Sequence, residues 1–498
     1  MLSYIWAVST VSKHDCDCLL QIRAVTFRVH THIVYTVHYL LSEDLTTEGL
    51  CVAYKRIYGI KGDIITPGDP EYNEARQEWN RRIQRFPRAI VYCENRKDVS
   101  RSVEWAQQTA SPIRLRGGGH HYEGYSTGNG ALVIDVSRMN SVTVEDGLVR
   151  AEGGVSNRAL YDAVGPLGYA FPSGTCPTVC VSGLTQGGGW GLSCRLLGLT
   201  CDSLVSAELV NASGRIVTAN AHCNQDLFWA LRGGGGGNFG VVTALTYRLP
   251  DFKPETVTYV QLYYPNSDAA LQARFWETWQ RWVPDADRRL TLQASIYHAE
   301  EEGFAVYSRG LFFGTPEEAM QAVEPLTALP GCRTSFQATT FYEAIQIIEA
   351  GYPPSEKFKS TGRYVTCPID SEDIRGFTDS LRDYPRGSVF TAYSLYMLGG
   401  AVADKSPQET AFFFRDAPYI ALLQSIWEDG RYEAVNTGWV DRNFPPLARA
   451  TAGSYINFPY SSLKDYMRAY YGGNAARLRR VKRMYDPCNV FCFQQSIR

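Results

Sequence analysis

The stretch RLRGGGHHYEGYSTGNG at residues 114–130 places three consecutive glycines directly before two adjacent histidines. The whole chain holds only eight histidines, so two neighbours in one loop point to a specific role. Glycine lets backbone N–H groups approach a ligand closely and form concave sites for anions. The flanking segments IRLRG and ALVIDVS are typical of strands. The stretch therefore predicts two strands joined by a glycine loop that contacts a ligand.

Two further glycine-rich loops follow at residues 187–191 and 233–240. The last contains a literal GxGxxG pattern, which indicates a dinucleotide-binding fold only between a strand and a helix. Here the helix-like LFWALRG precedes it and the strand-like VVTALTYRL follows, so the order is reversed and the pattern argues against a Rossmann fold. No GxxxxGK[ST] motif occurs either. The three loops favour a backbone cradle for a large phosphorylated cofactor over the alternative that they only form tight turns.

The composition excludes several classes of protein. A net charge of −2 over 498 residues indicates no nucleic-acid partner and no anionic membrane surface. No apolar run reaches the roughly 18 residues that a membrane span needs. The 13 cysteines are scattered and form no paired CxxC zinc framework. With no basic segment near the N-terminus to indicate a signal peptide, we expect a cytoplasmic protein, with secretion as the alternative.

Residues 1–58 differ from the rest of the chain. A metal site is one interpretation of this segment, but the spacing of its potential ligands matches no established site. We interpret residues 1–58 as an extension that either belongs to the protein or results from a misassigned start. The potential ligands are His14, Cys16, Cys18, His30, His32, His38 and Cys51.

The chain changes character after Pro250. The segments TVTYVQLYYP, RLTLQASIYHA and AVYSRGLFFG are alternating, aromatic strands, and TPEEAMQAVEPL begins like a capped helix. Strands and helices of this kind predict an antiparallel sheet with helices on one face. A helical tail follows, from LKDYMRAYY to the end of RRVKRMYDP. The fold class that we predict is α+β.

Cys176 lies in a second distinctive stretch, FPSGTCPTVC, directly before Pro177 and shortly before a glycine loop. A lone cysteine is most often a small buried apolar residue. The position of this one beside a glycine run, in a chain that also contains GGGHH, favours a functional role instead.

Taken together, these segments resemble the berberine bridge enzyme family, a group of FAD-linked oxidases with the vanillyl-alcohol oxidase fold. The resemblance implies a two-part FAD-binding domain of the PCMH type at 59–253 and a substrate domain at 254–445, with residues 446–498 returning to the FAD domain. It runs in order from about residue 60 to the end and rests on RLRGGGHHYEGYS, ALVIDVSRMN, FPSGTCPTV, GGGWGLSCRLLGL, DLFWALRGGGGGNFGVVT and AYYGGNAARLRRVKRMYDPCNVFCFQQSI.

The resemblance implies that FAD is attached covalently at two positions. His120 corresponds to the histidine that bonds to the flavin 8α-methyl, and Cys176 to the cysteine that bonds to flavin C6. Two bonds hold the ring without a closed pocket and make the flavin a stronger oxidant. His121 then belongs to the loop and is not a further link. The other cofactor-binding positions that the resemblance implies are Arg116, Gly117, Gly118 and Gly119 at the pyrophosphate and Gly183, Gly187, Gly188 and Val241 on the adenine side.

The resemblance also implies roles on the substrate side. Tyr122 is expected to face the substrate over the flavin, and Gln424 to supply a polar group near it. Val179 occupies the position that controls access of O2, where valine is typical of oxidases and leucine of dehydrogenases. Tyr393 and Tyr396 are further candidates for the pocket.

One position departs from the family pattern. The catalytic tyrosine that many members carry near the C-terminus is replaced by Phe458 in SYINFPY, and a phenyl ring cannot take a proton. Tyr455 matches the earlier tyrosine of the family segment. If this segment is a strand, Tyr460 points to the same side as Phe458. Tyr460 is therefore a candidate catalytic base, with a packing role as the alternative.

The resemblance therefore implies an FAD-dependent oxidase with a small-molecule substrate and O2 as its partners. It would take hydride from a C–H beside a hydroxyl or amine of a sugar or secondary metabolite and produce H2O2. One alternative is a dehydrogenase that uses an acceptor other than oxygen. Another is a flavin-bearing protein without turnover, which Phe458 favours and the intact His120 and Cys176 oppose.

Overall fold

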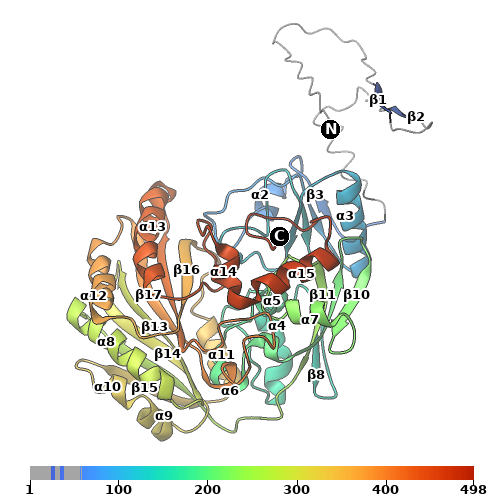
Figure 1. Ribbon diagram of the computed structural model, residues 1–498. Helices are drawn as coiled ribbons and strands as arrows, with labels where there is room; N and C mark the ends of the chain where they lie inside the picture. The colour runs from blue at the N-terminus through green and yellow to red at the C-terminus, as the bar shows by residue number, and fades with distance from the viewer. Residues whose placement is uncertain (1–23, 29–33, 39–56, 58) are drawn as a thin grey trace. The chain divides into compact units, whose positions relative to one another are not determined.

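The computed structural model describes residues 24–28, 34–38, 57 and 59–498 (Figure 1). Strand β1 (Ala24–Arg28) pairs antiparallel with β2 (Val34–His38) in a unit that is separate from Tyr54–Arg498. Apart from His38 in β2, the potential metal ligands of residues 1–58 lie outside the described residues. Within the described ranges, no group of three or more His, Cys, Asp or Glu side chains could hold a metal ion.

The first part of the larger unit contains two sheets. One has the order β3-β4-β6-β5, in which β4, β6 and β5 are parallel. The other has the order β10-β9-β11-β8-β7 and is antiparallel. The strands are β3 (Ile64–Ile65), β4 (Ala89–Tyr92), β5 (Ile113–Arg116), β6 (Leu132–Asp135), β7 (Val142–Glu145), β8 (Leu148–Glu152), β9 (Leu204–Val210), β10 (Ile216–Asn220) and β11 (Val241–Arg248).

Helices connect these strands, and two of them, α5 (Val181–Gln186) and α7 (Gln225–Ala230), end shortly before glycine loops. Helix α3 (Arg96–Gln108) begins at Asn95, whose side chain accepts hydrogen bonds from two backbone N–H groups of its first turn. The loop at 233–240 follows helix α7 (Gln225–Ala230) and precedes strand β11, so the reversed order that argues against a Rossmann fold is confirmed. The other helices are α2 (Tyr72–Ala75), α4 (Asn157–Val164), α5 (Val181–Gln186) and α6 (Cys194–Leu197).

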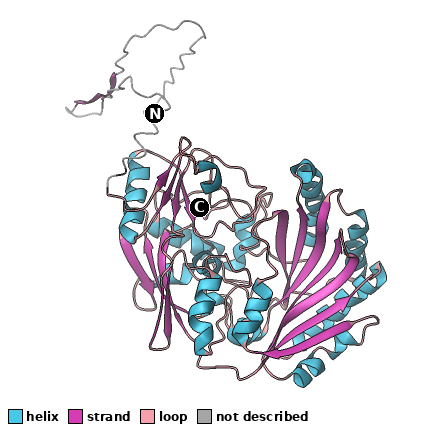
Figure 2. Cartoon of the chain, turned by 180° about the vertical axis from the view of Figure 1, so that it is seen from behind, coloured by secondary structure: helices cyan, strands magenta, loops and turns pink. Residues whose placement is uncertain are grey.

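The second part is a seven-stranded sheet of order β15-β12-β14-β13-β17-β18-β16, in which every neighbouring pair is antiparallel. Figures 1 and 2 show helices lined up along one of its faces. The expected α+β architecture is therefore confirmed. The strands are β12 (Val257–Tyr264), β13 (Leu290–Ala299), β14 (Gly303–Phe312), β15 (Arg333–Thr339), β16 (Lys357–Val365), β17 (Ser388–Met397) and β18 (Tyr419–Trp427).

A large aromatic core fixes the covering helices to this sheet. Trp276 and Trp279 of α8 (Ala269–Trp282) and Trp439 of α13 (Glu433–Arg449) are completely buried against apolar side chains of the strands. Fully burying one large apolar side chain contributes about 1.5–3 kcal/mol to the stability of the fold. This face of the sheet therefore forms part of the hydrophobic core, and the opposite face is the one that can contact a ligand. The helices of this part are α8 (Ala269–Trp282), α9 (Pro316–Ala322), α10 (Glu324–Thr327), α11 (Phe341–Glu349), α12 (Ser371–Ser380) and α13 (Glu433–Arg449).

The C-terminal segment packs against the glycine loop at 233–240. After α14 (Tyr466–Tyr471), helix α15 (Ala475–Tyr485) places Lys482, whose Nζ donates to the backbone oxygen of Asn238 at 2.7 Å. The side chain of Asn238 accepts from the backbone N–H of Ile497 at 2.9 Å. The predicted boundary between the substrate domain and the C-terminal segment, at residue 445, falls within helix α13, which ends at Arg449. The domain bounds remain a prediction.

No helix among the described residues has both the length and the apolar character that a bilayer crossing requires. The expected cytoplasmic location stays a prediction.

Candidate active site

A cavity of about 480 Å³ lies where the glycine loops meet the uncovered face of the seven-stranded sheet. This volume falls within the range of roughly 300–1,000 Å³ that is typical of ligand sites. The predicted site residues that line the cavity are Arg116, Gly117, Gly118, Gly119, His120, Tyr122, Cys176, Val179, Gly183, Val241, Tyr396 and Gln424. The structure therefore brings most of the sequence-predicted positions together in one place.

The glycine loop after β5 packs backbone to backbone against the segment that carries Cys176. A Cβ on Gly118 would lie 2.5 Å from the carbonyl oxygen of Thr178, and one on Gly117 would lie 3.1 Å from Cβ of Cys180. Gly119 has a φ of +69°, which favours glycine. These close approaches require glycine and bring His120 next to the Cys176 segment.

Arg116 is held by the protein itself. Its guanidinium forms an ion pair with Asp135 and donates to the backbone oxygen of Ala75 at 2.8 Å and to the Tyr92 hydroxyl at 3.3 Å. Because its donors are engaged, an anion in the cavity would be bound by backbone N–H groups of the neighbouring loop more than by this side chain.

One hydroxyl group contacts both expected link residues. Oγ1 of Thr178 lies 2.8 Å from Nε2 of His120 and 3.9 Å from Sγ of Cys176. The imidazole also stacks on Trp79, with ring centroids 5.0 Å apart. Since Nε2 is engaged by Thr178, Nδ1 is the ring nitrogen that remains available; among the described residues it has no hydrogen-bond partner.

The buried surroundings of His120 and Cys176 favour the uncharged form of both side chains. Burial lowers the pKa of His120 to about 4, so the imidazole carries no charge at neutral pH and keeps a lone pair. Burial also raises the pKa of the Cys176 thiol. His121 points elsewhere: its Nδ1 accepts from the backbone N–H of Glu123 at 3.2 Å and its ring packs against Tyr125. This agrees with its expected role within the loop.

Aromatic rings and amides form the sheet side of the cavity. The ring of Tyr122 stacks on Phe458 at 5.4 Å and meets Phe358 edge-on at 4.8 Å. Burial raises the pKa of Tyr122 well above its ordinary value. In the sheet, Gln293 lies opposite Tyr396, and its Nε2 donates to that hydroxyl at 3.2 Å. Such a wall offers stacking surface together with hydrogen-bonding groups.

Two of the predicted tyrosines do not reach the cavity. Tyr393 lies on the helix-covered face of the sheet, packed against Trp276. Tyr460 donates to Oδ1 of Asp441 at 2.7 Å and packs on Phe444 with centroids 4.1 Å apart. The argument for Tyr460 assumed an extended strand.

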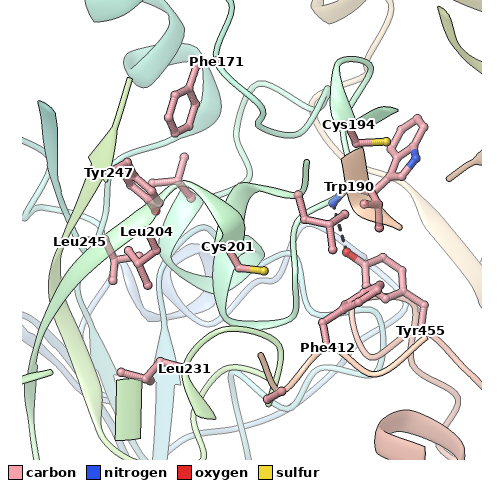
Figure 3. Packing of buried hydrophobic residues seen from close by; sticks show 14 of the residues in the cluster. Phe171, Trp190, Cys194, Cys201, Leu204, Leu231, Leu245, Tyr247, Phe412 and Tyr455 are labelled. Atoms are coloured by element: carbon pink, nitrogen blue, oxygen red, sulfur yellow. Dashed lines mark hydrogen bonds between the residues drawn. The ribbon is translucent and has the colours of Figure 1, made fainter. Parts of the chain in front are cut away.

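The segment around Phe458 is instead a turn. The backbone N–H of Phe458 donates to the carbonyl of Tyr455 at 2.9 Å, so side chains do not alternate as in a strand. Tyr455 anchors the second glycine loop: its hydroxyl accepts from the backbone N–H of Gly189 at 3.1 Å. It also accepts from the backbone N–H of Trp190 at 3.2 Å, the bond drawn in Figure 3. The structure therefore gives Tyr460 a packing role.

Gly187 and Gly188 also serve packing and do not line the cavity. A Cβ on Gly187 would lie 1.9 Å from Oδ1 of Asn457, and one on Gly188 would lie 2.7 Å from the Phe412 ring. The glycines allow the C-terminal segment to approach this loop. The prediction that both residues line the adenine side of the cofactor is not supported by this placement.

The far end of the cavity fits an elongated ligand. A Cβ on Gly183 would meet no atom within 4 Å, and one on Gly236 would meet nothing closer than 3.8 Å, so both glycines keep space open. Oε1 of Gln186 is buried there without a hydrogen-bond partner among the described residues. An unpaired buried acceptor fits a bound group that donates a hydrogen bond, as the amino group of an adenine does.

Comparison with known proteins identifies the family. Residues 87–220 match the model of an FAD binding domain, and residues 454–498 match the berberine and berberine-like model. An uncharacterized FAD-linked oxidoreductase of Bacillus subtilis, YgaK, is 35% identical over 447 residues, which are 88% of this chain and 97% of that protein.

Two fungal proteins are also similar. The carbohydrate oxidase of Microdochium nivale is 29% identical, with 92% of this chain and 96% of that protein covered. The structure of glucooligosaccharide oxidase from Acremonium strictum, described as carrying a 6-S-cysteinyl, 8α-N1-histidyl FAD, superposes with a TM-score of 0.81 at 24% identity, covering 90% of this chain and 98% of that one. This chain is a member of the berberine bridge enzyme-like family of FAD-linked oxidoreductases.

Proposed function

We propose that the protein is an oxidase that converts a C–H bond beside a hydroxyl group of a carbohydrate to a carbonyl and passes the electrons to O2. The observation that carries this proposal is the single cavity that His120 and Cys176 share with the aromatic and amide groups of the sheet. Bound FAD supplies the hydride acceptor. Similarity to a carbohydrate oxidase supports a hydroxylated substrate.

We propose that FAD is attached through Nδ1 of His120 and Sγ of Cys176. The two side chains contact one hydroxyl group and line the same cavity, and Nδ1 is the imidazole nitrogen left free by Thr178. Backbone N–H groups of Gly117–Gly119 hold the pyrophosphate, and Gly183 and Val241 border the adenine side.

Thr178→Val tests how the imidazole is positioned, because valine keeps the shape of threonine without its hydroxyl. In a Cys176→Ala background, where acid-stable flavin reports the His120 bond alone, we expect attachment about fivefold slower, the effect of losing roughly 1 kcal/mol of hydrogen bonding. The measurement is the time course of acid-stable flavin after FAD is added to the apoprotein. Thr178→Ser, which keeps the hydroxyl, is the control; equal rates for both variants would contradict this role.

The sheet side of the cavity binds the substrate. Tyr122 and Tyr396 offer ring faces and hydroxyls, and Gln293 and Gln424 offer amides. Flat stacking against a sugar ring together with hydrogen bonds to its hydroxyls is the recognition that such a wall favours. Gln424 acts by hydrogen bonding, since an amide does not exchange a proton at neutral pH.

The activity is tested by measuring H2O2 release from a panel of reducing sugars: glucose, maltose, cellobiose and xylobiose. The proposal predicts one H2O2 for each sugar oxidised and anaerobic bleaching of the flavin absorbance by the same sugar. Bleaching without H2O2 in air would identify a dehydrogenase. If none of the sugars bleached the flavin, the proposal would be contradicted. A flavin-bearing protein that does not turn over carbohydrates would then be favoured.

Val179→Leu tests O2 as the acceptor. Val179 lines the cavity directly after the Cys176–Thr178 segment, so a longer side chain there narrows the approach to the flavin. We expect reoxidation by O2 to slow by about tenfold, which corresponds to a barrier raised by roughly 1.4 kcal/mol, and reoxidation by an artificial dye to be unchanged. Stopped-flow absorbance after anaerobic reduction with dithionite measures both rates. If reoxidation by O2 and reoxidation by the dye slowed equally, Val179 would not specifically control the access of O2.

A further inference from the structure

The proposed oxidation requires a group that accepts a proton. When a carbinol becomes a carbonyl, its C–H electron pair leaves as hydride and its O–H proton must go to a base. Phe458 stands where the family resemblance implies a tyrosine, and Gln424 carries a neutral amide. Tyr460 is bonded to Asp441 outside the cavity. The proton acceptor is therefore neither Gln424 nor Tyr460.

The other titratable side chains of the cavity are poor bases or already engaged. Burial raises the pKa of each cavity tyrosine, so these hydroxyls hold their protons at neutral pH. Burial lowers the pKa of His120 and of His121 to about 4, which makes both weak proton acceptors, and His120 is also the proposed link. The tyrosines with raised pKa are Tyr122, Tyr125, Tyr352 and Tyr396.

Glu356 is the one carboxylate among the described residues that line the cavity. Its side chain forms no ion pair and no hydrogen bond with another described residue. The carboxylate is therefore available to interact with a ligand in the cavity. The titratable groups that face it are Tyr122, Tyr352 and Cys176, whose ionisation Glu356 disfavours. Tyr122 is expected over the flavin and Cys176 at the flavin ring, and Tyr352 lines the same cavity, which places the carboxylate at the reacting end.

The backbone at Glu356 is fixed to the segment that supports His120. Its N–H donates to the carbonyl of Trp79 at 3.2 Å, and its carbonyl accepts from the N–H of Arg81 at 2.7 Å. The ring of Trp79 stacks in turn on His120. The backbone that carries the carboxylate is therefore held close to the segment of the link residue, and a fixed placement of this kind is what general-base catalysis requires.

We propose that Glu356 is the catalytic base that takes the proton of the substrate hydroxyl. The O–H bond breaks as the C=O bond forms, and the carboxylate gains the proton and later releases it to water. The hydride is passed by way of the bound FAD to O2, the oxidant of the proposed function, which takes up one further proton from water and leaves as H2O2. This assignment rests on the proposed function.

Burial raises the pKa of Glu356 to about 7, so a substantial fraction of the carboxylate is ionised at neutral pH. Since the base must be deprotonated to act, the rate of substrate oxidation is expected to rise with pH through about 7 and then level off. None of the groups that face Glu356 titrates near this pH, because their pKa values are raised from ordinary values that are already higher.

The test compares Glu356→Gln with Glu349→Gln in the flavin-loaded protein. Glu349, on α11, is also a buried carboxyl whose pKa burial raises to about 7, but it pairs with Arg158 and does not line the cavity. The first readout is the flavin absorbance from pH 5 to pH 9 without substrate. We expect a spectral titration with a midpoint near 7 in the wild type and in Glu349→Gln, and none in Glu356→Gln.

The second readout is the anaerobic rate of flavin reduction by the sugar panel. We expect Glu356→Gln to reduce this rate at least about 100-fold and to abolish its rise with pH, while Glu349→Gln keeps both. A spectral titration that survives in Glu356→Gln, or an unchanged reduction rate, would overturn the assignment. Absence of reduction by any sugar in the wild type would instead refute the proposed function, and the inference with it.

Discussion

Replacing both His120 and Cys176 with alanine is expected to release all FAD when the protein is denatured with acid. The wild type is expected to keep its flavin through the same treatment, because the proposed carbon–nitrogen and carbon–sulfur bonds would survive unfolding. Removing both nucleophilic side chains leaves only the glycine-loop cradle, whose contacts vanish on unfolding. Flavin absorbance in the supernatant and in the precipitate measures the two fractions.

The single variants provide the controls for this result. His120→Ala and Cys176→Ala are each expected to retain acid-stable flavin through the remaining bond, and Cys176→Ala is expected to lower the reduction potential. Acid-stable flavin in the double variant would show that another side chain forms a link. Release from either single variant would show that one of the two bonds does not form.

Gly183→Leu is expected to prevent FAD from binding while the fold is retained. A Cβ at this position meets no atom within 4 Å, and the glycine borders the cavity, so a leucine side chain would fill space that the cofactor needs. We expect affinity for FAD to fall at least about 100-fold, which corresponds to roughly 2.7 kcal/mol. Titration of the apoprotein with FAD, followed by the quenching of flavin fluorescence, measures the effect.

Gly376→Leu is the matched control for this substitution. Gly376 also lies within a helix, α12, and a Cβ there also meets no atom within 4 Å, but it does not border the cavity. Both changes replace a helical glycine with a better helix former, a gain of up to about 1 kcal/mol. Equal FAD affinity in the two variants would show that the cavity at Gly183 is not the cofactor site.

The local features of the site were predictable because short-range chemistry specifies them. Three glycines followed by His120, and a cysteine before Pro177, mark loops that need close backbone approach, and the structure places both loops at one cavity. The reversed order of helix and strand around the last glycine loop could be read from periodicity. The alternating aromatic strands predicted the antiparallel sheet for the same reason.

The features that were missed depend on contacts between residues far apart in sequence. Glu356 lies in the segment YPPSEKF, which carries no recognisable motif, and its backbone pairs with Trp79, a residue far away in sequence. Tyr460 was favoured by an assumed alternation, but the carbonyl of Tyr455 closes a turn there. Thr178 is the one missed residue for which the sequence offered a signal. Its hydroxyl lies two residues after Cys176, so a contact with the proposed flavin-linking side chains could have been predicted.

The most direct test of the proposed active site is mass spectrometry of flavin-containing peptides after proteolysis of the purified protein. A single flavin that joins a peptide containing His120 to a peptide containing Cys176 is the predicted result, and it would place the reacting ring in the cavity described above. Unmodified peptides at both positions, with free FAD in solution, would contradict the bicovalent site.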